Sequence, residues 1–147
     1  MARTHFTVGE VEELIPKLER IFTYVLQLRA GLRAVEEKLD RSGIRMKRED
    51  LLQTEAGPPE VRRAKAVFRG FYEALSDEIE NVRALGGQVK DIDSGLVDFP
   101  GRRGPEEILL CWKLGEKKIE FWHTVNGGFS SRRPIDEQIP RLPQRLD

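Results

Sequence analysis

Two acidic residues and one histidine in the C-terminal part of the sequence could support metal binding or acid–base catalysis: Asp98, Glu120 and His123. Carboxylate oxygens and imidazole nitrogens are ligands for divalent metal ions, and a carboxyl group with a shifted pKa can act as an acid or a base. In a strand, Glu120 and His123 lie on opposite faces, which is the wrong spacing for shared ligation. The candidate ligands for a divalent metal ion are therefore Asp98 and His123. The alternative is structural: Asp98 and Asp91 would accept hydrogen bonds from the backbone or from arginine and fix the loops, and His123 would have a hydrogen-bonded, structural role.

Two pairs of arginines lie near glycine-rich loops, and with Trp122 or Phe129 nearby they could bind a small anion or a nucleotide. The residues concerned are Arg102, Arg103, Arg132 and Arg133. Such arginines also commonly pair with surface carboxylates. The chain holds 25 basic and 25 acidic residues, and the two signs balance on each side of Gly86. Because nucleic-acid-binding proteins usually carry a basic excess, nucleic acid is not an expected partner.

Cys111 is the single cysteine, so no disulfide can form within the chain. It lies between Leu110 and Trp112 in an apolar run, and burial there would raise the pKa of its thiol. Cys111 is therefore a weak candidate for a nucleophile.

The residues after Gly87 must be positioned by short strands, because apolar residues here alternate or form short runs between turn signals. The expected strands are 88–92, 95–99, 108–112 and 119–121. The segment 108–112 is apolar on both faces, which is typical of a central strand. Beyond residue 128, prolines and arginines predict an extended tail on the surface.

The N-terminal part predicts two long helices. Thr7 and Glu10 fit a capping box. An unbroken heptad seam then follows, formed by Val11, Leu14, Leu18, Ile21, Val25, Leu28, Leu32, Val35 and Leu39. Pro16 lies inside this seam and predicts a bend rather than an end of the helix. After a break over 40–57 that includes a short helical turn, a second helix is expected over 59–85.

The fold class that follows is α+β: a long antiparallel helical hairpin over 1–86, followed by a small antiparallel or mixed β-sheet module over 87–147 that packs at the hairpin base as one domain. Apolar residues off the main seam could mate with a second copy, which favours a homodimer. These residues are Phe22, Tyr24, Val67, Tyr72 and Ala74. The alternative is a monomer in which the β module covers these residues.

The favoured function is a non-enzymatic assembly or partner-binding module that dimerises through its hairpin. The alternatives are a metal-dependent or acid–base enzyme with a site on the β module, and a binder of a small anion, nucleotide or nucleic acid. The sequence has no signal-peptide pattern and no apolar run long enough for a membrane span, so a cytoplasmic protein without a membrane partner is expected.

Several segments of the β module resemble an uncharacterised prokaryotic family, the domain-of-unknown-function family 2203. They are the segment from Gly87 to Pro100, the segment from Leu109 to His123, and the motifs Gly128-Phe129 and Arg132-Arg133-Pro134. The segment from Phe6 to Leu18 also looks like the start of that family. The resemblance implies helices combined with a small sheet, and it lends no catalytic residues.

Overall fold

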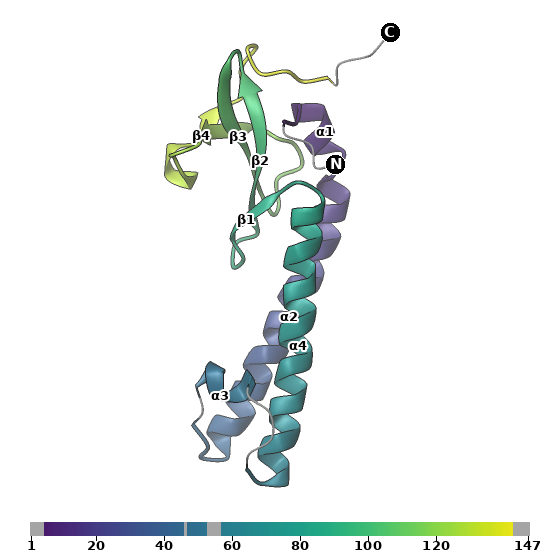
Figure 1. The fold of residues 1–147 in the computed structure, drawn as a ribbon, viewed down its shortest axis with the longest axis vertical. Helices are drawn as coiled ribbons and strands as arrows, with labels where there is room; N and C mark the ends of the chain where they lie inside the picture. Colours follow the sequence, from purple (N-terminus) through teal and green to yellow (C-terminus); the bar gives the residue numbers. More distant parts are fainter. Residues whose placement is uncertain (1–4, 46, 53–56, 143–147) are drawn as a thin grey trace. The chain divides into compact units, whose positions relative to one another are not determined.

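The computed structural model describes residues 5–45, 47–52 and 57–142. The chain forms two compact units (Figure 1). Unit 1 consists of Met1–Phe22 with Glu80–Asp147, and unit 2 consists of Thr23–Ile79. No helix among the described residues combines the length and the apolar character that a membrane span requires.

The first helix of unit 1 begins where it was predicted to begin, but it is much shorter than the predicted helix. The Thr7 hydroxyl accepts a hydrogen bond from the Glu10 backbone N–H, and the Glu10 carboxylate accepts one from the Thr7 N–H, which completes the capping box of α1 (Val8–Glu12). The prediction that Pro16 only bends a continuous helix is wrong, because α1 ends at Glu12 and α2 (Ile15–Arg41) begins three residues later. Pro16 has no N–H to offer the preceding turn, and the first turn of a new helix does not need one.

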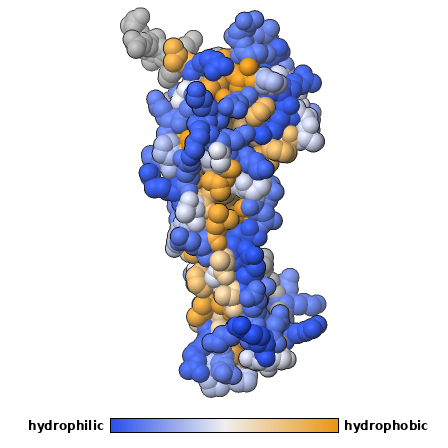
Figure 2. All heavy atoms as spheres, turned by 180° about the vertical axis from the view of Figure 1, so that it is seen from behind, coloured by the Kyte–Doolittle hydropathy of each residue, from blue (hydrophilic) through white to orange (hydrophobic). Residues whose placement is uncertain are grey.

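Unit 2 is built from the long part of α2, the short helix α3 (Arg48–Leu52) and most of α4 (Pro59–Ala84). Its core joins all three helices through Leu32, Leu39, Leu51 and Phe68. The heptad seam thus supplies the buried stripe of α2 within this unit. On the face shown in Figure 2, hydrophobic residues also gather in a strip along the long helices. Part of the predicted break, at residues 46 and 53–56, lies outside the described residues.

The sheet of unit 1 is a five-stranded antiparallel meander in the order β1-β2-β3-β4-β5. Its strands are β1 (Gln88–Asp91), β2 (Leu96–Arg103), β3 (Glu106–Lys113), β4 (Phe121–Thr124) and β5 (Arg133–Pro134). The predicted central strand is β3, and it is central in this order. β2 and β3 extend further toward each other than predicted, so that Gly104 and Pro105 alone connect them.

The two faces of the sheet differ in chemistry. One face presents Phe99 and Trp112, whose rings contact Phe6 and Phe22 at centroid distances of 5.3 Å and 6.0 Å. On the other face, register places Asp98 opposite Cys111 and Leu109 opposite His123. Because side chains alternate along a strand, Asp98, Cys111 and His123 lie on the face of the sheet opposite to Phe99 and Trp112.

The α+β fold class is therefore confirmed, with long helices followed by an antiparallel sheet. The proposed domain boundary at Gly86 stays a prediction. The two compact units divide the long helices at Phe22 and Ile79, and each helix contributes residues to both units.

Candidate functional site

Asp98, Cys111 and His123 form a buried polar cluster on the sheet of unit 1. They come from three neighbouring strands, β2, β3 and β4. Asp98 and His123 are each 2% exposed, and Cys111 is 0% exposed. The carboxylate oxygen, the thiol sulfur and the imidazole nitrogen all lie within 4.8 Å of one another. The structure thus brings together two of the three residues predicted as a site and adds Cys111.

The hydrogen bonds of His123 fix its tautomer. Its Nδ1 lies 2.8 Å from the Thr124 carbonyl oxygen. A carbonyl oxygen can only accept a hydrogen bond, so Nδ1 carries a proton and donates it. Nε2 lies 2.9 Å from Oδ2 of Asp98, and this contact requires one further proton shared between imidazole and carboxylate. His123 therefore directs Nε2 at the cluster and holds its other nitrogen on the backbone.

The other carboxylate oxygen of Asp98 is a buried polar atom without a hydrogen-bond partner among the described residues. Leaving a buried acceptor unsatisfied costs roughly 1–3 kcal/mol, and more for a charged group. An oxygen in this position therefore indicates that the cluster can accept a further hydrogen-bond donor or a cation.

Burial, together with the neighbouring negative charge of Asp98, raises the pKa of the Cys111 thiol to about 12. A thiol of this kind is a poor nucleophile at neutral pH. The order of the groups also differs from that of a nucleophilic triad, in which a histidine lies next to the nucleophile and the carboxylate supports the histidine. Here Asp98 hydrogen-bonds His123 and also contacts Cys111.

The donor set suits a transition-metal ion such as zinc. Zinc in proteins is bound tetrahedrally by cysteine sulfur, histidine nitrogen and carboxylate oxygen at about 2.0–2.3 Å, which places its ligand atoms roughly 3.3–3.8 Å apart. The hydrogen bond of 2.9 Å between Asp98 and His123 would have to open slightly to admit the ion. Histidines that bind metal through one nitrogen typically donate the other N–H to a carbonyl or carboxylate, as His123 does to Thr124.

Glu120, the third predicted site residue, does not belong to this cluster. It is exposed and precedes the first residue of β4. Its backbone carbonyl accepts a hydrogen bond from Ile135, which attaches the C-terminal segment to the sheet.

Arg132 lies beside the cluster and is held by several contacts. Its guanidinium donates to both carboxylate oxygens of Glu116 at 2.7 Å and 2.9 Å and to the Cys111 carbonyl at 3.2 Å. It also stacks on the rings of Phe121 and Phe129, at 4.2 Å and 4.8 Å from their centroids. The Nε atom of Arg132 is a buried donor without a partner among the described residues. Sequence reasoning named Arg132 for anion binding and did not foresee its pairing with Glu116.

The structure does not gather the four predicted anion-binding arginines in one place. Arg103 and Arg133 both lie over the Trp122 ring, and Arg103 is also paired with Asp136 at 2.8 Å. Arg132 stacks on Phe121, the strand neighbour of Trp122, and so lies on the opposite face of the sheet. Arg102 is exposed and pairs in register with Glu107. Anion binding by these residues stays a prediction.

Comparisons with known proteins give one match. No curated protein and no solved structure matches the chain. A family model described as "Uncharacterized conserved protein (DUF2203)" matches residues 4–135, which include both long helices and all three residues of the buried cluster. The chain therefore belongs to the DUF2203 family of uncharacterized conserved proteins.

Proposed function

We propose that this protein binds a divalent transition-metal ion, zinc above all, through Asp98, Cys111 and His123. The observation that carries the proposal is the convergence of one oxygen, one sulfur and one nitrogen ligand within 4.8 Å on one face of the sheet. A mixed set that includes a thiolate favours zinc over magnesium or calcium, which prefer oxygen ligands alone.

Two further features support a metal ion over a merely structural hydrogen-bond cluster. The unpartnered oxygen of Asp98 would gain a partner on metal binding. The Nδ1–H bond to Thr124 already leaves Nε2 of His123 as the ligating nitrogen. Three protein ligands would leave one tetrahedral position for water, which is the coordination found in catalytic zinc sites.

The proposal favours metal binding over metal-free acid–base catalysis. Asp98 and His123 are each 2% exposed, so a substrate could not reach the proton that they share without a rearrangement of the sheet. A metal ion needs no such access once it is bound.

The experiment is a zinc titration by calorimetry of protein first stripped with a chelator and then freed of it. We expect a single ion to bind per chain, and we expect Asp98→Asn, Cys111→Ser and His123→Gln each to abolish or strongly weaken binding. Loss of one ligand commonly lowers zinc affinity by far more than the roughly 10–100-fold caused by changes around the ligands. Cobalt in place of zinc should produce a thiolate-to-metal absorption band that Cys111→Ser removes.

Two matched controls separate ligation from general effects. His5→Gln removes the other histidine of the chain, and Glu120→Gln removes the predicted carboxylate that lies outside the cluster. Both variants should bind zinc like the parent protein. The proposal fails if the parent protein binds no zinc or cobalt. It also fails if well-folded ligand variants, judged by circular dichroism, bind as tightly as the controls.

A further inference from the structure

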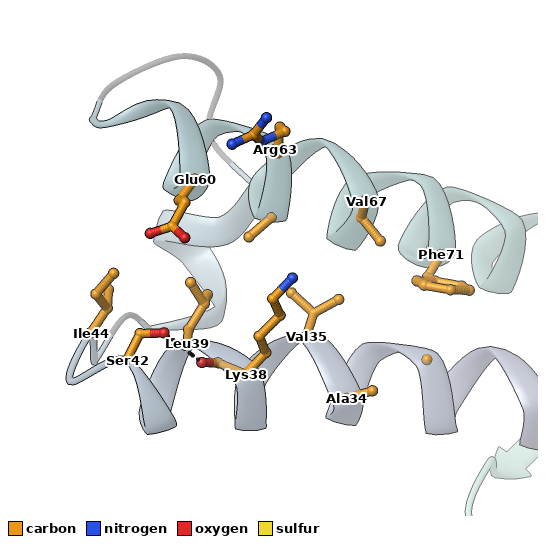
Figure 3. A pocket seen from close by; sticks show the side chains of 12 residues that line it. Ala34, Val35, Lys38, Leu39, Ser42, Ile44, Glu60, Arg63, Val67 and Phe71 are labelled. Atoms are coloured by element: carbon orange, nitrogen blue, oxygen red, sulfur yellow. Dashed lines mark hydrogen bonds between the residues drawn. The ribbon is translucent and has the colours of Figure 1, made fainter.

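The long helices of unit 2 enclose an open groove on one side (Figure 3). The groove has a volume of about 570 Å³ and is lined mainly by apolar residues of α2 and α4. Figure 3 shows Val35, Val67 and Phe71 turned into the space between the helices. Val67 is 50% exposed, so the groove leaves apolar surface in contact with water.

The groove is part of a longer surface, here called the groove face, which is formed by one row of residues on α2 and one row on α4. On α2 it carries Tyr24, Gly31 and Lys38, which are spaced by seven residues and so lie in line. On α4 it carries residues spaced by three or four, namely Arg63, Val67, Gly70, Ala74 and Glu78. The α4 row extends over about 22 Å at 1.5 Å per residue. The pocket lining includes Arg63 and Val67 but stops short of Ala74 and Glu78.

The two rows are arranged around two glycines at the same level of the hairpin. A Cβ atom added to Gly31 would lie 2.6 Å from the Phe71 ring, so Gly31 of α2 faces the position next to Gly70 of α4. A Cβ atom added to Gly70 would meet no atom within 4 Å. About two helical turns to one side of Gly70 lies the basic residue Arg63, and about two turns to the other side lies the acidic residue Glu78.

We infer that a second copy of this chain docks on the groove face, with each long helix antiparallel to its own counterpart and a two-fold axis passing near Gly31 and Gly70. This axis brings Arg63 of each copy to Glu78 of the other. It also brings Lys38 of each copy to the ring of Tyr24 of the other, a pairing that cation–π attraction favours. The small residues near the axis allow the helices to approach closely.

A second copy accounts for the surface better than a small molecule does. A groove of this volume could hold a drug-sized ligand, but such a ligand would not reach Tyr24 or Ala74, which lie outside the pocket lining. In a two-fold interface the same patch lies on both copies and must be complementary to itself. Arg63 and Glu78 meet this condition, because they carry opposite charges at similar distances on either side of Gly70. The groove face is complementary to itself in this sense.

The sequence-based choice of interface residues changes in two respects, because Phe22 and Tyr72 are not part of the groove face. Tyr72 lies about 140° around α4 from Val67. Tyr24, Val67 and Ala74 lie on the groove face. Phe22 is 2% exposed and packs against Trp112, so it has no surface to offer a second copy.

The test is sedimentation equilibrium of the full chain over a wide concentration range. We expect a reversible dimer, and we expect Val67→Glu to raise the dissociation constant at least roughly thirtyfold because it places a charge in the buried centre of the interface. The matched control is Leu26→Glu. Leu26 is 46% exposed, close to Val67 in exposure, but lies about 200° around α2 from Tyr24, so this change should alter dimerisation by less than about threefold.

Charge reversal tests the register. Arg63→Glu and Glu78→Arg should each weaken the dimer roughly tenfold, because each places like charges opposite one another. The double variant carries both reversals in each chain and should return to within about threefold of the parent protein. A parent protein that is monomeric at every concentration overturns the inference. So do equal effects of Val67→Glu and Leu26→Glu, or a double variant weaker than either single one.

Discussion

At the scale of single residues, the buried thiol of Cys111 makes folding sensitive to alkaline pH in the metal-free protein. Its pKa is raised from 9.0 to about 12 in the fold, so the unfolded chain loses this proton at lower pH than the folded chain does. Stability is therefore retained below pH 9 and decreases as pH rises toward 12, by up to about 1.4 kcal/mol per pH unit.

Unfolding by urea at a series of pH values should show this decrease, and Cys111→Ser should show a smaller one. A thiol reagent should also modify the folded protein slowly at pH 8, because little thiolate is present. Rapid modification under native conditions would mean that Cys111 is neither buried nor protonated as described.

Asp98 contributes to stability as well as to the proposed metal site. Removing one partner of a buried hydrogen bond leaves the other partner unsatisfied and costs about 1–3 kcal/mol. Asp98→Ala should therefore lower the free energy of unfolding of the metal-free protein by an amount in this range. Glu120→Ala, at an exposed position, should change it by less than about 0.5 kcal/mol. Similar effects of the two substitutions in chemical denaturation would contradict the buried pairing of Asp98 with His123.

Part of the cluster could be foreseen from the sequence. Asp98 and Cys111 are each six residues from the nearer member of the Gly104-Pro105 turn, so a tight hairpin at that turn pairs them. The strands expected from the sequence end at residue 99 and resume at residue 108, and the longer loop that this implies does not reveal the register. His123 could not be placed in the same way, because seven residues separate β3 from β4 and a loop of that length does not fix the register.

At the scale of elements, the contact between α2 and α4 depends on a glycine at one position and tolerates a side chain at another. Gly31→Ala places a methyl group against the Phe71 ring and should destabilise unit 2 by about 1–3 kcal/mol. Gly70→Ala meets open space and should stabilise α4 by about 0.5–1 kcal/mol, because alanine loses less backbone entropy.

Both substitutions are best measured by thermal unfolding in a Val67→Glu background, so that self-association does not contribute. Shifts of the melting temperature in the same direction for both would mean that Gly31 and Gly70 do not differ in packing as the structure shows.

The elements themselves were predictable where their signals are local. The capping box at Thr7 marked the start of α1, and the heptad seam identified the buried side of α2. The separation of α1 from α2 depends on which backbone hydrogen bonds form around Pro16. The heptad seam keeps its register across Pro16, so it gives no sign of this separation. Strand ends depend on pairing partners and were therefore predicted less well than helix ends.

At the scale of the whole molecule, the two proposals concern different parts of the chain. The proposed metal ligands all belong to unit 1, and the groove face belongs to unit 2. We therefore expect the two properties to be separable. Val67→Glu should bind zinc with the affinity of the parent protein, and Cys111→Ser should dimerise like it. Titration and sedimentation of both variants check this, and loss of both properties in either variant would contradict it.

The most direct test of the proposed metal site is native mass spectrometry of the untagged parent protein and its Cys111→Ser variant, both stripped of metal and then supplied with equal amounts of zinc. We expect the parent protein to retain the mass of one zinc ion per chain and the variant to retain none. Equal zinc retention by the two proteins, or none by the parent protein, would contradict a metal site at Asp98, Cys111 and His123.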